Sequence, residues 1–314
     1  MAAIFLDEAE VGELLDMESC IAALDEAFRE KGLGEAAVQP RRRLPFQGRR
    51  FHMMSATLPR LGYVGFKAYG AARGQDVALY KAGEGLVAFI RSGRLGQVRT
   101  GAASGVATRY MARADASRVG CFGTGHQAET QLTAMAAVRK LESVHIFGRD
   151  AERRKAFAER MSGLLDLEVR PVESAAEAVK GRDIVITITN ASEPVFDGAL
   201  LEPGTHINAA GGNVRTMREL DQTAVTRAGT ITTDDVEGAK IECGDLSWPI
   251  EAGLMSWDRV YELGYVVAGL MPGRRSDDEI TLFESQGVAL EDVAAARVVY
   301  ERARERGLGT ALPF

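Results

Sequence analysis

The sequence predicts an α/β fold made of a Rossmann-type, doubly wound parallel sheet and a smaller α+β domain. Two observations carry this prediction. Short Val/Ile-rich runs alternate with helical segments from about residue 118 onward, and a glycine-rich turn follows the first of these runs. At 314 residues the chain has room for about two domains. We assign residues 1–113, joined by about 290–314, to the α+β domain, and residues 114–289 to the Rossmann domain.

The first domain begins with helical signals and continues as a sheet. Asp7 and Glu10 have the spacing of a helix capping box, and apolar residues then recur at helical spacing up to Phe28. Four strand-like runs follow, "RRFHMMSAT", "YVGFKAYG", "VALYKAG" and "GLVAFI", separated by glycine-containing turns. The small residues of "RTGAASGVATRYMA" predict a helix that another backbone can approach closely.

The second domain reads as strict alternation. The predicted strands are "RVGCFG", "SVHIFG", "EVRPV", "DIVITIT", "THINAA" and "GTITTDD", with helices such as "HQAETQLTAMAAVRK" between them. Such continuous apolar strands are typical of a parallel sheet covered on both faces. The last helical segment, "ALEDVAAARVVYERARERG", has one apolar face and is expected to pack back on the first domain.

Composition excludes several classes of protein. Hydrophobic residues make up 46% and charged residues 26%, with a formal net charge of −6, which argues against a nucleic-acid or anionic-membrane partner. The start lacks the pattern of a secretory signal, and no run is long enough to span a bilayer. Three scattered cysteines without a CxxC pair indicate reduced thiols. We therefore expect a cytoplasmic protein, with no metal site.

A nucleotide site is predicted directly after the first strand of the Rossmann domain. Gly123-Thr124-Gly125-His126-Gln127-Ala128 has GxGxxA spacing between a strand and a helix. Gly123 permits a tight turn, Gly125 lets the backbone approach a pyrophosphate, and Ala128 allows close helix–strand packing. The helix N-terminus favours the negative charge of the pyrophosphate. A glycine turn without a ligand is the alternative interpretation.

The end of the second strand bears on the choice of dinucleotide. A carboxylate there binds the ribose hydroxyls of NAD, whereas an arginine meets the 2′-phosphate of NADP. Gly148 takes the usual carboxylate position, followed by Arg149 and Asp150, with Arg153 and Arg154 nearby. The excess of cations favours NADP, while Asp150 leaves NAD open. The remaining candidate cofactor contacts are Thr100, Thr189, Asn190 and Gly211.

Several motifs together resemble the ornithine cyclodeaminase/mu-crystallin family. They are "RTGAAS", "GTGHQA", "INAAGG" and "SQGVALED", and the resemblance covers essentially the whole chain. It implies an amino- or imino-acid substrate, a nicotinamide cofactor and a homodimer formed through the sheet of the first domain. That domain is thereby expected to serve substrate binding and dimerisation.

The resemblance also implies roles for four cationic positions. The family's "QPxR" arginine falls on Arg42, with Arg41 an almost equal match, its strand lysine on Lys67 and its "RTAA" arginine on Arg99. In the family these cations hold the substrate carboxylate, and Lys67 could also move a proton. His52, on a predicted strand of the same domain, is a further candidate for substrate contact.

Asn213 bears on the reaction. Where this family's cyclodeaminases carry an Asp after the glycines of "AAGGNV", this chain has Asn213, and an amide cannot act as a general base near neutral pH. We therefore predict an NAD(P)-dependent oxidoreductase that reduces a small imino acid, or interconverts an amino acid and its imino or keto acid, with Asn213 as a hydrogen-bonding group. A cyclodeaminase and a non-catalytic ligand-binding protein remain the alternatives.

Overall fold

The computed structural model describes residues 2–70 and 74–313, which divide into two compact units. Unit 1 comprises Met1–Ala103 with Gly287–Phe314, and unit 2 comprises Ser104–Gln286. The predicted fold class, a parallel Rossmann sheet together with an α+β part, is confirmed.

Within its described residues, unit 1 is built on a seven-stranded sheet in the order β15-β1-β6-β5-β4-β3-β2. The strands are β1 (Ile4–Leu6), β2 (Ala37–Phe46), β3 (Arg49–Leu58), β4 (Tyr63–Tyr69), β5 (Gln75–Lys81), β6 (Gly85–Arg91) and β15 (Thr310–Ala311). The helices are α1 (Glu8–Leu14), α2 (Met17–Gly32), the first part of α3 (Gly93–Met111) and α11 (Ala289–Arg306). The strands from β2 to β6 pair antiparallel, and β1 joins β6 in parallel.

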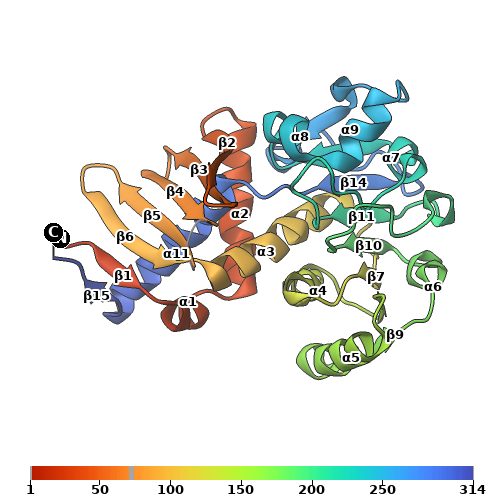
Figure 1. Cartoon of the computed structure of the whole chain (residues 1–314), viewed down its shortest axis with the longest axis horizontal. Helices are drawn as coiled ribbons and strands as arrows, with labels where there is room; N and C mark the ends of the chain where they lie inside the picture. The colour runs from red at the N-terminus through yellow and green to blue at the C-terminus, as the bar shows by residue number, and fades with distance from the viewer. Residues whose placement is uncertain (1, 71–73, 314) are drawn as a thin grey trace. The chain divides into compact units, whose positions relative to one another are not determined.

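Helix α11 covers one face of this sheet. It packs along β3, β4 and β5 and against α2, as Figure 1 shows. Leu290, Val293 and Ala294 are fully buried, and the last helix packs on the N-terminal strands. Asp7 and Glu10 form the full capping box at the start of α1. The short strands β1 and β15 were not anticipated, because neither is long enough to show a period.

Unit 2 contains, in the described residues, an eight-stranded parallel sheet in the order β13-β12-β14-β11-β10-β7-β8-β9. The strands are β7 (Arg118–Phe122), β8 (Ser143–Phe147), β9 (Val169–Pro171), β10 (Ile184–Thr187), β11 (His206–Ala209), β12 (Thr230–Thr233), β13 (Val260–Glu262) and β14 (Thr281–Glu284). The helices are α4 (His126–Val138), α5 (Ala151–Leu165), α6 (Ala175–Val179), α7 (Gln222–Arg227), α8 (Val236–Glu242), α9 (Gly244–Glu251) and α10 (Leu263–Val267), with 3₁₀ turns η1 (Gly198–Leu200) and η2 (Trp257–Arg259).

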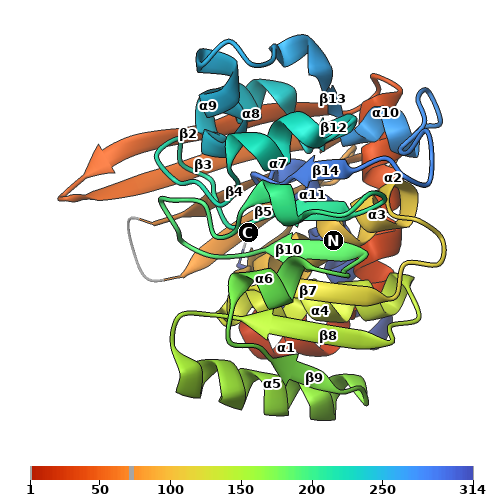
Figure 2. The ribbon, with the colours of Figure 1, turned by 90° about the vertical axis from the view of Figure 1, so that its right-hand side faces the viewer.

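The strand order of unit 2 locates its ligand-binding edge. The chain runs from β7 outward to β8 and β9, and then returns to β10 on the other side of β7. In Figure 2 the labelled strands β14, β10, β7 and β8 follow one another from top to bottom, which is their spatial order in the sheet. Sheets of this kind bind ligands beyond the carboxyl ends of their strands at such a reversal. The loops after β7, β10 and β11 therefore form the edge where a nucleotide is expected.

Candidate functional site

Unit 1 holds a buried group of charged side chains, which we call the charged cluster: Arg41, Lys67, Arg99, Glu291 and Asp292. The Lys67 ammonium lies 2.9 Å from Oδ1 of Asp292. The Arg99 guanidinium reaches the same oxygen at 3.2 Å and Oε2 of Glu291 at 2.7 Å. Lys67 is only 3% exposed and both carboxylates are fully buried. Two strands and two helices thus bring five charges together away from water.

Local sequence explains how these charges reach one another. A Cβ at Gly96 of α3 would lie 2.9 Å from the Lys67 ammonium, so glycine leaves space for the lysine end. Glu291 and Asp292 stand in the first turn of α11, where the helix dipole favours negative charge. The sequence reading missed both acids as site residues, because they fall within the segment read as an amphipathic helix with a polar outer side.

Arg41, and not Arg42, belongs to the charged cluster. Arg41 is buried and its guanidinium donates to the Gly287 carbonyl at 2.8 Å, whereas Arg42 is exposed. The β2–β3 register shifts between Gln39 and Arg42, which marks a bulge. A bulge interrupts the alternation of inward and outward side chains along a strand. Alternation along the sequence therefore could not indicate which of the two arginines faces inward.

His52 and Tyr69 are neighbours of the charged cluster. Their rings stack with centroids 4.5 Å apart, and the Lys67 ammonium lies 5.7 Å from the Tyr69 ring centroid. Burial, together with Arg43 and other nearby arginines, lowers the pKa of His52. His52 is therefore neutral at neutral pH, and it contributes an aromatic surface and not a charge.

Burial also sets the protonation of the charged cluster. It lowers the pKa of Lys67, an effect that Asp292 opposes and Arg99 reinforces. Burial by itself would raise the pKa of Asp292, but Arg99 and Lys67 outweigh it and the pKa of this carboxyl is lowered. Asp292 is thus an ionised partner, and Lys67 is a lysine that releases its proton more readily than an exposed one.

The glycine fingerprint of unit 2 has the geometry of a nucleotide loop. Gly123 adopts a φ of +119°, and a Cβ there would lie 2.4 Å from the Ile188 carbonyl oxygen. Gly125 precedes the first residue of α4 and has open space where a Cβ would point. Ala128, in the first turn of α4, is fully buried, whereas His126 is exposed and Thr124 and Gln127 are partly exposed. The loop can therefore accept a pyrophosphate against its backbone.

Of the candidate ribose contacts after β8, two side chains bond to other parts of the protein and one is exposed. Arg154 is buried and donates to the Gly148 carbonyl at 2.6 Å and to Glu173 at 2.8 Å. Asp150 caps α5 by accepting the Arg153 amide at 3.0 Å. Arg149 is exposed. Two of the three predicted contacts thus have structural partners at this strand end.

Three predicted cofactor residues follow β10 and β11. Thr189, Asn190 and Gly211 all lie at the carboxyl edge of the sheet, in the loops where Asn213 also lies. The buried carboxylate of Glu219 accepts the amides of Thr189 and Gly211, and the sequence reading did not identify it. Thr100 differs from these residues, because it lies in unit 1 and its hydroxyl donates to the Gly96 carbonyl at 2.7 Å.

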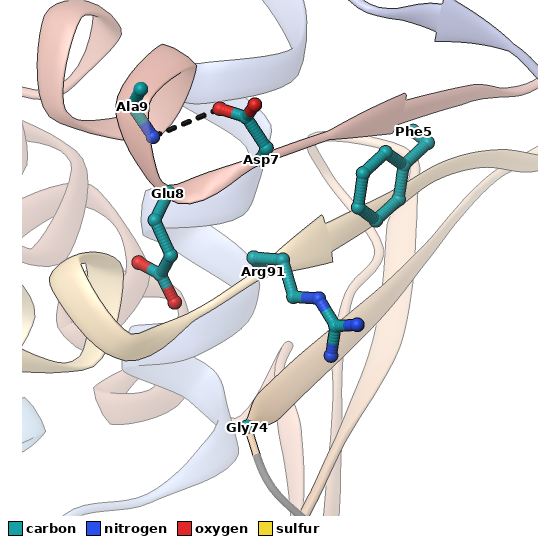
Figure 3. Close-up of a pocket in the computed structure, with 6 residues that line it drawn as sticks. All are labelled: Phe5, Asp7, Glu8, Ala9, Gly74 and Arg91. Atoms are coloured by element: carbon teal, nitrogen blue, oxygen red, sulfur yellow. Dashed lines mark hydrogen bonds between the residues drawn. The ribbon is translucent and has the colours of Figure 1, made fainter.

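A separate hollow of about 490 Å³ opens on unit 1, and none of the predicted site residues lines it. Figure 3 shows its lining, which consists of Phe5, Asp7, Glu8, Ala9, Gly74 and Arg91. Glu8 accepts the amides of Gly93 and Arg94 at 2.7 and 2.8 Å, and Arg91 pairs with Asp76 at 2.9 Å. These contacts join α1 to α3 and β6 to β5, and we assign no ligand to the hollow.

Within residues 2–70 and 74–313, no helix is long and apolar enough to cross a membrane. The same part of the chain contains no group of three or more His, Cys, Asp or Glu side chains arranged to hold a metal ion. Cys20, Cys121 and Cys243 are buried and form no disulfide.

A nucleotide-binding Rossmann unit and a buried cationic site on an α+β unit define the class of this protein. The model of the ornithine cyclodeaminase/mu-crystallin family matches residues 1–307, and the chain belongs to this family. It is 39% identical to a Δ1-pyrroline-2-carboxylate reductase of Bacillus cereus over 236 residues, 75% of this chain and 72% of the relative. It is 33% identical to an alanine dehydrogenase of Archaeoglobus fulgidus, covering 100% of this chain and 99% of the relative.

A solved structure agrees with these relatives. The Thermococcus litoralis Δ1-pyrroline-2-carboxylate reductase, in complex with NADH and L-proline, superposes with a TM-score of 0.92 at 34% identity. The match covers 98% of this chain and 100% of that one. Both units of this chain are therefore present in a solved relative.

Proposed function

We propose that this protein is an NAD(P)-dependent oxidoreductase that reduces the C=N bond of a small imino acid, with a cyclic imine such as Δ1-pyrroline-2-carboxylate as the first candidate. The observation that carries the proposal is the charged cluster. Arg41, Lys67 and Arg99 are buried close together, and Asp292 and Glu291 hold Lys67 and Arg99 in place. Guanidinium and ammonium donors gathered in a buried place suit the carboxylate of a small imino acid.

The residues of the charged cluster have two roles, binding of the substrate carboxylate and donation of a proton. Arg41 and Arg99 bind the carboxylate, because a guanidinium offers two parallel N–H donors. Lys67, with its pKa lowered by burial, donates a proton to the imine nitrogen. A bound nicotinamide supplies the hydride for the imine carbon. One hydride on carbon and one proton on nitrogen convert the imine into the amine, and the reverse direction oxidises an amino acid.

The loop after β11 favours simple reduction over cyclodeamination. Asn213 can donate or accept a hydrogen bond, but it cannot take up a proton from water or an amine near neutral pH. Ring-forming deamination needs such proton transfers in addition to hydride transfer. Release of ammonia from ornithine without net NADH formation would support the cyclodeaminase alternative.

For the cofactor we propose a nicotinamide dinucleotide held by the Gly123 loop. NAD is supported by the NADH in the Thermococcus litoralis relative. The preference for NADP that the sequence suggested now depends on Arg149, since Arg154 is bound to the Gly148 carbonyl and to Glu173. Replacement of Arg149 by Ala should raise the KM for NADPH more than that for NADH.

We also propose a cytoplasmic homodimer formed through the open face of the unit 1 sheet. Met53, Val64 and Tyr80 are large apolar side chains exposed on this sheet. Such an apolar patch is typical of an interface, and buried, unbonded cysteines fit a reducing compartment. Light scattering of the wild type and of Val64→Glu tests the dimer, since the charged variant should be monomeric.

The test of the function is oxidation of NADH and NADPH by purified protein. The substrates are Δ1-pyrroline-2-carboxylate, Δ1-piperideine-2-carboxylate, and pyruvate with ammonia or methylamine. Turnover of a cyclic imine is the expected result. Turnover only of pyruvate with ammonia would make the protein an amino-acid dehydrogenase. Nucleotide binding without turnover of any of them would overturn the proposal in favour of a binding protein.

A further inference from the structure

Glu219 is a buried carboxylate at the carboxyl edge of the unit 2 sheet. It is fully buried, and its two oxygens accept the backbone amides of Thr189 at 2.5 Å and Gly211 at 2.8 Å. Thr189 lies two residues beyond the end of β10, and Gly211 lies two residues beyond the end of β11. One side chain therefore joins equivalent points of two neighbouring loops.

The two loops are in direct contact at this point. A Cβ at Gly211 would lie 2.3 Å from the Thr189 carbonyl oxygen and 2.5 Å from Oε2 of Glu219. No other residue type fits there without moving one of the loops. The glycine of "INAAGG" is thus explained by close approach of the Thr189 loop and the Glu219 carboxylate.

The contact continues into the nucleotide fingerprint. Ile188, which precedes Thr189, donates its amide to the Phe122 carbonyl at 2.9 Å. The Ile188 carbonyl is the atom that leaves no space for a Cβ at Gly123. The ends of β7, β10 and β11 therefore touch in series, and Glu219 fastens the last two.

Glu219 is itself held by its surroundings. Oδ1 of Asp245 accepts the amides of Glu219 and Leu220 at 2.8 and 2.9 Å, and the Glu219 carbonyl accepts the Val195 amide at 2.9 Å. A carboxylate fixed at its backbone and bound by two amides has little freedom to move. Loss of either oxygen would leave a part-buried amide without its acceptor, which is the costly way to lose a hydrogen bond.

We propose that Glu219 is a positioning residue for cofactor binding. It fixes the Thr189 and Gly211 loops, and through them Asn213, in the shape that receives the nicotinamide half of the dinucleotide. The inference rests on the proposed function in that a dinucleotide must bind. It assigns these loops to the nicotinamide half because β10 and β11 belong to the second half of the doubly wound sheet.

A matched carboxylate lies at the opposite edge of the same sheet. Oδ2 of Asp183 accepts the amides of Ser117 and Arg118 at 3.1 and 2.9 Å, at the start of β7. Asp183 is also buried, and it pairs with Arg113 and Arg118. Replacing Asp183 by Asn therefore disturbs the same kind of contact where no ligand is expected.

The experiment compares Glu219→Gln with Asp183→Asn in the full chain. Hydrogen exchange without ligand is expected to show loss of protection at the amides of Thr189 and Gly211 in E219Q, because the Gln amide group cannot accept from both. Titration of NADH fluorescence is expected to give a Kd raised at least tenfold in E219Q. It should remain within twofold of the wild type in D183N, even though that variant unfolds at lower temperature.

Kinetics provide the readout that general destabilisation would not give. For E219Q we expect a lower kcat and a KM for NADH that is raised more than the KM for the imino acid. If E219Q does not fold, Glu219→Asp, which keeps the carboxyl group but is too short to reach both amides, should show the same pattern. Unchanged NADH affinity and kcat, or an equal loss in D183N, overturns the inference. Failure of the wild type to bind any dinucleotide overturns the proposed function instead.

Discussion

Replacing Asp292 by Asn should destabilise unit 1 strongly. The carboxylate is fully buried and serves two cations, Lys67 at 2.9 Å and Arg99 at 3.2 Å. Removing one partner of a buried ion pair typically costs about 3–5 kcal/mol, because the other charge stays buried without compensation. Arg99 keeps Glu291 at 2.7 Å, so most of this cost should arise at Lys67.

A double-mutant cycle isolates the pair. Asp292→Asn leaves the buried Lys67 charge without its carboxylate, and Lys67→Met removes that charge. The loss in the free energy of unfolding should therefore be smaller in the double variant than the sum of the two single losses, by about 2 kcal/mol. Urea unfolding followed by circular dichroism at pH 7 measures each free energy of unfolding. Glu35→Gln is the control, since the Arg60–Glu35 pair at 3.2 Å is exposed and should contribute under about 1 kcal/mol. Additive effects of Lys67→Met and Asp292→Asn would refute the reasoning.

The same variant changes the pH dependence of turnover. Asp292 raises the pKa of Lys67 against the effects of burial, Arg99 and Arg41, so removing the carboxylate lowers this pKa further. If Lys67 donates the proton, activity falls as pH rises through its pKa. In D292N that decline should shift to lower pH, and a decline at unchanged pH would exclude Lys67 as the donor.

Three further predictions follow from single positions. Gly123→Ala should abolish NADH binding measured by fluorescence, because its Cβ would meet the Ile188 carbonyl at 2.4 Å and its φ is +119°; unchanged affinity would rule out the assigned loop. Arg41→Ala should raise the KM for the imino acid at least tenfold whereas Arg42→Ala should leave it within twofold, and the reverse order would return the role to the exposed arginine. Burial raises the pKa of Asp245 from 3.8 to about 7, so the folded protein binds more protons than the unfolded chain between these values, and stability falls as pH rises from 4 to 7. Thermal unfolding scans at pH 5 and pH 8 should therefore show a smaller decrease in unfolding temperature in Asp245→Asn than in the wild type. An equal decrease in the variant and the wild type would contradict the raised pKa of Asp245.

The sequence was sufficient to predict the Rossmann-type fold of unit 2, because the patterns that indicate it are local. The fingerprint from Gly123 to Ala128 lies on one turn between a strand and a helix, so its spacing already implies its geometry. The strand β14 (Thr281–Glu284) was missed, since four residues after a loop show neither period clearly. The end helix was anticipated, but its acidic first turn was taken for a solvent-facing side.

The partners of the charged cluster could not be predicted in the same way. Lys67 and Arg99 stood out by their motifs, but Asp292 lies 225 residues from Lys67 in the chain. Periodicity tells which face of an element is apolar, and it gives no information about which distant charge that face meets. The bulge before Arg42 had the same effect, because it changes which arginine turns inward without leaving a mark in the residue pattern.

By itself the sequence determined the α/β fold class, the glycine-rich turn between β7 and α4 and the family, because each depends on residue types at fixed local spacing. Only the tertiary structure decided that Arg41 is the inward arginine, that Asp292 neutralises Lys67, and that Glu219 fastens two loops. Burial and ion pairing are properties of side chains brought together from distant segments. Their energies depend on the surrounding dielectric and on distances of a few ångströms, which exist only once the chain has folded.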